Sequence, residues 1–121
     1  MNIESVKTLF GMFSGEEYSE RFAPMIRLAL SETERILRPD ADRSDVRLDF
    51  LAAAMAHYRV RQLRSAQDKD RFTYAGKMAA SVQSGSLDCA EKLLRDYYEL
   101  CSDLIVPQTF LFMSIPAKEV L

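Results

Sequence analysis

The sequence has 121 residues but no tryptophan, one histidine, two cysteines, four glycines and four prolines. The glycines lie far apart, so they form neither a phosphate-binding loop nor a dinucleotide fingerprint. One histidine and two separated cysteines do not supply the ligand spacing of a zinc site. We therefore expect no metal ion and no cofactor.

Catalytic groupings are also missing from the sequence. His57 is the only histidine, and on a mainly apolar helix a histidine is more often a core or interface residue than a catalytic base. No serine stands in a Gly-x-Ser-x-Gly turn, and the acids are scattered along the chain. We expect no enzymatic activity and assign no catalytic residue.

Long apolar runs are absent as well. The longest in the body of the chain, Phe50–Ala56, is far shorter than the roughly 20 residues of a membrane-spanning helix. The first ten residues carry an early acid and do not resemble a secretory signal. Cys89 and Cys101 would lie about 18 Å apart along one helix, too far for a disulfide. We expect a soluble cytoplasmic protein with reduced thiols and no membrane association.

What is present predicts one helical domain over residues 1–121. Apolar side chains recur at helical spacing in four segments, which favours an all-α fold, a small four-helix bundle. In the second segment Ser14 and Glu17 match a capping box, and Pro24 marks either a kink near Glu20 or the first turn of a helix that starts at about Ala23. The expected helices cover residues 2–13, about 17–38, 44–64 and 84–106.

Alanines make the third expected helix small on several faces at once. Such a helix lets its neighbours approach closely, so we expect it to be the central and most buried element. The alanines are Ala52, Ala53, Ala54 and Ala56.

The helical pattern is interrupted between the third and fourth helices. Residues 65–71 are polar and predict a loop, and residues 72–84 alternate like a strand. The local sequence offers no sheet partner for such a strand, whose edge would need a cover. We expect an extended ribbon or hairpin here that contacts another protein chain.

A second apolar segment follows the fourth helix. Phe110, Leu111 and Phe112 stand between Pro107 and Pro116 in a stretch too apolar to remain exposed to water. We expect residues 108–121 to form an extended tail that packs on the bundle or docks on a partner.

The net charge of −2 is unevenly distributed. Residues 1–42 carry five basic and eight acidic side chains (−3), residues 43–77 carry eight and four (+4), and residues 78–121 carry three and six (−3). The basic middle contains a cluster that either contacts DNA phosphates by charge or faces an acidic neighbour. Its members are Arg59, Arg61, Arg64, Lys69 and Arg71.

From Phe50 onward the order of elements resembles the head-tail connector (head completion, DNA-packaging) proteins of tailed phages and prophages. The features that carry the resemblance are Ala52–Tyr58 on a helix, Phe72–Gly76 at the start of the ribbon, a helix built on Ala90 and Leu93, and Phe110–Phe112 after it. Lys77 departs from the pattern, because an acid often follows the Ala-Gly pair in that family.

The resemblance implies a structural adaptor that forms a ring below the portal, for example a dodecamer, extends the DNA channel and docks tail or stopper proteins. It implies assembly in the host bacterial cytoplasm, a final place in the virion, and transient non-specific passage of DNA. Our hypothesis for the contacts with neighbours uses nine residues of the ribbon and the tail. They are Phe72, Tyr74, Gly76, Lys77, Met78, Val82, Phe110, Leu111 and Phe112.

Two other functions fit the same sequence. A small helical regulatory or protein-interaction module would bind one partner through the apolar tail and stay monomeric or dimeric. A weak nucleic-acid-binding protein would use the basic middle segment, and its affinity would fall steeply with salt.

Overall fold

The computed structural model describes residues 1–70 and 76–107, and describes side chains within these ranges except at 68–70 and 76–85. The elements are α1 (Ile3–Ser14), the 3-10 turn η1 (Glu20–Phe22), α2 (Ala23–Ile36), α3 (Val46–Asp70) and α4 (Gly76–Leu100). The prediction of an all-α protein with four helices is confirmed for this part of the chain. None of these helices combines the length and apolar composition needed to cross a membrane.

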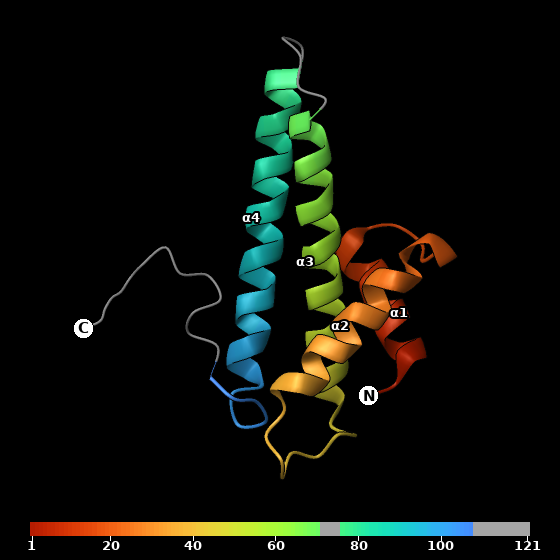
Figure 1. Cartoon of the computed structure of the whole chain (residues 1–121), viewed down its shortest axis with the longest axis vertical. Coiled ribbons are helices and arrows are strands. Elements are labelled where there is room, and N and C mark those ends of the chain that lie inside the picture. The colour runs from red at the N-terminus through yellow and green to blue at the C-terminus, as the bar shows by residue number, and fades with distance from the viewer. Residues whose placement is uncertain (71–75, 108–121) are drawn as a thin grey trace, which may run out of the picture.

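The long helix α3 lies at the centre of the arrangement (Figure 1). Helix α4 runs antiparallel beside it, and α1 and α2 pack against another side of its lower part. The upper ends of α3 and α4 project as a two-helix hairpin beyond α1 and α2. In the described part of the molecule, α1, α2 and α4 therefore surround one end of α3. At the other end of this described part, α3 and α4 lie beside only each other, and we call this region the bare hairpin.

Helix α1 begins and ends at residues that suit these positions. The side-chain oxygen of Asn2 accepts hydrogen bonds from the backbone N–H groups of Glu4 (3.0 Å) and Ser5 (3.2 Å), which would otherwise lack a partner. Gly15 follows the helix with φ of 75°, a left-handed conformation that glycine adopts without strain. The predicted end of this helix at Ser14 and Gly15 is confirmed.

Helix α2 starts later than the capping-box pattern predicts. Ser14 is still part of α1, where its hydroxyl donates to the Gly11 carbonyl (3.4 Å), so its pairing with Glu17 as a cap for α2 is wrong. A loop and η1 come first, and Pro24 sits in the first turn of α2. A proline is tolerated there because the N–H that it lacks has no helical partner. Of the two roles left open for Pro24, the start of a helix at Ala23 is confirmed.

The alanines of α3 fill the centre of the core. Ala52, Ala53, Ala54 and Ala56 are completely buried, together with Leu48 and Leu51 in the preceding turns. Small side chains on several faces allow α1, α2 and α4 to approach α3 from different directions. The prediction that this helix is the central and most buried element is confirmed.

The prediction of a loop at residues 65–71 is wrong up to Asp70, because α3 continues through these residues. The segment contains neither glycine nor proline, and its polar side chains suit a helix in the uncovered part of the hairpin. Helix α4 runs antiparallel beside this part of α3 (Figure 1).

The predicted ribbon is also wrong from Gly76 onward, because α4 begins there. Alanine, lysine, methionine and glutamine favour helices, and the small residues between them fit a period of 2 or of 3.6 equally well. The aromatic residues that made the alternation distinct, Phe72 and Tyr74, lie outside the described residues.

A short backbone pairing joins the ends of α2 and α4. Leu37 and Ile105 form an isolated antiparallel bridge, flanked by hydrogen bonds from Arg38 N–H to the Leu104 carbonyl (2.9 Å) and from Val106 N–H to the Ile36 carbonyl (2.8 Å). The bridge fixes the chain just before Pro107. The predicted tail at 108–121, with Phe110, Leu111 and Phe112, lies outside the described residues.

Candidate functional site

The predicted basic cluster lies on α3 and faces acids of the same chain. Arg59 pairs with Glu32 on α2, with Nη2 and Oε2 at 2.7 Å and Nε and Oε1 at 3.3 Å. These hydrogen bonds raise the pKa of Arg59 above its usual value. Arg59 thus holds α2 against α3, and Glu32 balances its charge.

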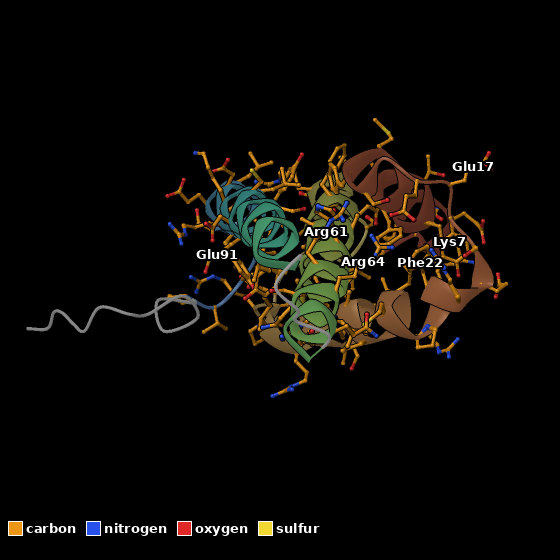
Figure 2. All side chains as sticks on the ribbon, turned by 90° about the horizontal axis from the view of Figure 1, so that it is seen from above. Lys7, Glu17, Phe22, Arg61, Arg64 and Glu91 are labelled. Atoms are coloured by element: carbon orange, nitrogen blue, oxygen red, sulfur yellow. The ribbon has the colours of Figure 1, made fainter. Side chains whose placement is uncertain are left out.

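Arg64 makes the corresponding link to the loop after α1. Its Nη1 donates to Glu16 Oε2 at 2.8 Å, and its guanidinium carbon lies 5.9 Å from the centre of the Phe22 ring. The hydrogen bond from Arg64 lowers the pKa of Glu16, with further lowering by the charges of Arg64, Arg21 and Arg61. In Figure 2 Arg64 and Phe22 point toward each other on the α1 side of α3.

Arg61 binds the end of α1. Its Nη2 donates to the Ser14 carbonyl at 3.1 Å, one of the last carbonyls of that helix, where a cation is favourable. Its Nε is buried and makes no hydrogen bond within the described part of the chain. Arg61 and Arg64 together fasten the α1 end and the following loop to α3.

His57 lies one turn before Arg61 and is only 6% exposed. Burial, followed by the positive charges of Arg61 and Arg64, lowers its pKa to about 4. The imidazole is therefore neutral near pH 7. Its Nδ1 is buried and has no hydrogen-bond partner among the described residues. The position of His57 in the core agrees with the expected core or interface role.

The structure thus accounts for three of the five predicted basic residues. The sequence suggested that the cluster either contacts DNA phosphates or faces an acidic neighbour. Arg59 and Arg64 do face acidic residues, but these residues belong to the same chain. Lys69 is in α3 with its side chain not described, and Arg71 is outside the described residues. All three arginines join elements of the fold, Arg59 and Arg64 through ion pairs and Arg61 through a backbone carbonyl. The two ion pairs leave little of the charge of Arg59 and Arg64 to hold phosphates.

The predicted interface residues are only partly placed by the structure. Gly76, Lys77, Met78 and Val82 belong to the first two turns of α4, at the projecting end of the hairpin. The other members of the set fall outside the described residues.

Residues of α1 and the following loop form a groove that the sequence did not reveal. The groove measures about 740 Å³, and we call it the α1 groove. Its lining residues are Glu4, Lys7, Thr8, Gly11, Met12, Gly15, Glu16, Glu17, Tyr18 and Glu20.

Gly11 sets the shape of the α1 groove. A Cβ atom at this position would lie 3.0 Å from the Glu16 carbonyl oxygen, so glycine allows the loop to fold closely against α1. Lys7 lies 5.0 Å from the centre of the Tyr18 ring and 3.5 Å from a Glu4 oxygen. The only sequence signal for this groove was the density of acids at 16–20.

The thiols and carboxylates do not assemble into a reactive or metal-binding group in the described residues. Cys89 is exposed and Cys101 is buried, and each is a free thiol. Burial raises the pKa of Cys101 to about 11, which keeps it protonated. No group of three or more His, Cys, Asp and Glu side chains in residues 1–70 and 76–107 is placed to hold a metal ion.

Comparisons with protein-family models, with curated proteins and with solved structures each found no match to this chain.

Proposed function

We propose that this protein is a structural adaptor of a phage or prophage head-tail connector. In this role copies of the chain form a ring below the portal, extend the DNA channel and dock tail or stopper proteins. The proposal combines the shape of the helical hairpin with the resemblance in the residue pattern of Ala52–Tyr58 and of the helix built on Ala90 and Leu93. The ribbon that also carried the resemblance is helical from Gly76 onward and adds no support.

The observation that carries the proposal is the projection of α3 and α4 beyond the other helices (Figure 1). Among the described side chains, Arg64 makes the last link from α3 to the α1 loop, and α3 continues for about 9 Å beyond it at 1.5 Å per residue. Near this level Leu63 is 46% exposed. In a bare hairpin each helix covers only one side of its partner, so neighbouring proteins have two open helix faces to contact.

The charge arrangement suits a channel that DNA crosses without being held. Strong phosphate binding would need several cations free of acidic partners, whereas Arg59 and Arg64 are already paired with Glu32 and Glu16. The net charge of −2 adds no general attraction for nucleic acid. Transient, non-specific passage of DNA is compatible with both features.

Assembly of the full chain tests this function. We would measure light scattering over a range of concentrations and image the particles by electron microscopy, with the protein alone and co-expressed with the portal protein of the same genome. Rings in either sample are the expected result. A chain that stays monomeric or dimeric in both would contradict the connector and favour the regulatory module.

The contribution of the predicted tail needs a separate measurement. Deletion of residues 108–121 is expected to leave a folded subunit that no longer assembles, because the apolar tail is proposed to dock on a neighbour. Circular dichroism would report folding, and light scattering would report assembly. Rings formed by the shortened chain would show that the tail is dispensable.

A DNA titration separates the remaining function. The connector predicts no measurable binding of the free subunit to duplex DNA at low or at physiological salt. Binding at low salt that falls steeply as the salt is raised, and that survives deletion of the tail, would instead support a weak nucleic-acid-binding protein.

A further inference from the structure

The α1 groove carries acidic side chains that the fold leaves without partners. Glu16 is paired with Arg64, and Glu4 with Lys7. Glu17 and Glu20 are exposed and make no side-chain hydrogen bond or ion pair with the described residues. Figure 2 shows Glu17 and Lys7 on the outer side of α1, far from Glu91 on α4.

The α1 groove also has an apolar element. Met12 is 71% exposed, the most exposed of the large apolar side chains in the described residues. An unbranched thioether adapts its shape to different contacts and is common in protein-binding surfaces. The groove therefore offers negative charge around an adaptable apolar contact.

Helix α2 presents the opposite chemistry on its outer face. Ile26, Ala29 and Thr33 are buried against the core. The opposite side, which we call the α2 strip, carries exposed residues at helical spacing. They are Arg27, Leu28, Ser31 and Arg35.

The cations of the α2 strip are available to a partner. Arg27 and Arg35 make no side-chain hydrogen bond or ion pair within residues 1–70 and 76–107, unlike Arg59 and Arg64. Leu28 lies on the same exposed side of the helix and is 46% exposed. The strip thus pairs positive charge with one apolar side chain, as the groove pairs negative charge with Met12.

We propose that the α1 groove of one copy of this chain binds the α2 strip of a second copy. In this contact Arg27 and Arg35 face Glu17 and Glu20, and Leu28 packs against Met12. The occupant is a second copy because the complementary surface is found on the same chain. The inference depends on the proposed ring, for which it names the contact between subunits.

The two surfaces are different parts of the subunit, so the contact is heterologous. A heterologous contact leaves one groove and one strip free at the ends of any open chain of subunits, and a ring satisfies all of them. Charges at the edge of such an interface set its specificity and association rate, and salt weakens their effect. The α1 groove and the α2 strip therefore supply the two different surfaces that a ring of identical subunits needs.

Charge reversal on each surface tests the contact. One full-length variant carries Glu17→Lys and Glu20→Lys, and another carries Arg27→Glu and Arg35→Glu. We expect each variant to associate at least tenfold more weakly than the wild type in sedimentation velocity, with the greatest loss at low salt. A matched control, Asp88→Lys with Glu99→Lys, makes the same charge change at exposed positions of α4 and should assemble normally.

Mixing the two variants provides the decisive measurement. Each then offers a surface complementary to the other at both contacts, so the equimolar mixture should assemble although neither variant does so alone. A single chain with all four substitutions should also assemble. Circular dichroism of each variant excludes unfolding as the cause of lost assembly.

The outcomes separate this contact from the function on which it rests. If the wild type forms rings, alone or on the portal, and charge reversal has no effect there, the proposed contact is wrong and the ring remains. Variants that lose assembly but are not rescued by mixing would also contradict the contact. If the wild type forms no ring in either setting, both the connector function and the contact fail.

Discussion

Arg64 on α3 and Glu16 after α1 are joined by two hydrogen bonds across 48 residues of sequence, with donor to acceptor distances of 2.8 and 3.4 Å. The same glutamate lies 3.5 Å from Arg21. The loop after α1 is therefore positioned on α3 by charge as well as by the turn at Gly15.

We expect Glu16→Gln to lower the free energy of unfolding by about 1 kcal/mol, because a partly exposed ion pair is worth at most about this much. Arg64→Met should cost a similar amount, and the double variant should cost less than the sum. Urea denaturation of the four proteins measures this coupling. Glu17→Gln, one residue along and without an ion-pair partner in the described part of the chain, should not change the stability of the single subunit. Additive losses would show that Glu16 and Arg64 are not coupled.

The stability of the protein should depend on pH through its single histidine, His57. The pKa of His57 is about 4 in the folded protein, against an ordinary value of 6.5, so the unfolded chain binds more protons between these values. The free energy of unfolding should be highest above pH 6.5 and should fall as the pH is lowered toward 4. At about 1.4 kcal/mol per pKa unit, the total loss is up to about 3 kcal/mol.

Denaturation of wild type and His57→Gln at pH 7 and pH 5 tests this prediction. The variant should show little change between these values, whatever its stability at pH 7. Glu16, Asp45 and Asp103 have lowered pKa values, so their contributions are present above their ordinary values and are lost only at still lower pH. An equal loss of stability in both proteins would show that another group is responsible.

The central position of α3 makes its alanines sensitive to size. Ala54→Leu inserts a large side chain into a fully buried position and should destabilise the protein by about 1–3 kcal/mol. Ala66→Leu places the same side chain at an exposed position of the same helix and should change stability by less than about 0.5 kcal/mol. Thermal unfolding of both variants provides the comparison, and equal effects would contradict the burial of Ala54.

Helix α4 starts nine residues before Gly85, which the sequence had placed at the opening of a helix. Gly85→Ala should therefore stabilise the protein by about 0.5–1 kcal/mol, because alanine favours a helix interior. Gly15→Ala should do the reverse by about 1 kcal/mol, since Gly15 has a φ of 75°. A gain at Gly15, or none at Gly85, would contradict these backbone conformations.

The features that were predicted correctly depend on strong local signals. Gly15 ends α1, as predicted, and Pro24 stands in the first turn of α2, which was one of the two roles that the sequence left open for it. The alanine run of α3 identified the central helix because few other arrangements use so many small side chains at once. These signals are present in the chain before any long-range contact forms.

The contacts of the candidate site join residues that are far apart in the sequence, so no local sequence pattern could predict them. The sequence showed that Arg59 and Arg64 are basic and close together, but not that Glu32 and Glu16 would meet them. The α1 groove likewise required the loop at 16–20 to fold back over Gly11. The charge counts by segment indicated that the protein has an acidic and a basic surface, but they did not show where on the fold these surfaces lie.

By itself, the sequence determined the helical class, the limits of α1 and the buried centre of α3, because glycine and alanine act through local sterics and size. It left two roles open for Pro24, and the structure selected the start of α2 at Ala23. Only the tertiary structure decided that residues 65–70 and 76–84 are helical. Their small and polar side chains have weak preferences of their own, and the packing of α3 against α4 favours the helix. The tertiary structure also decided that Arg59 and Arg64 are neutralised by Glu32 and Glu16, whereas Arg27 and Arg35 on α2 have no acidic partner in residues 1–70 and 76–107.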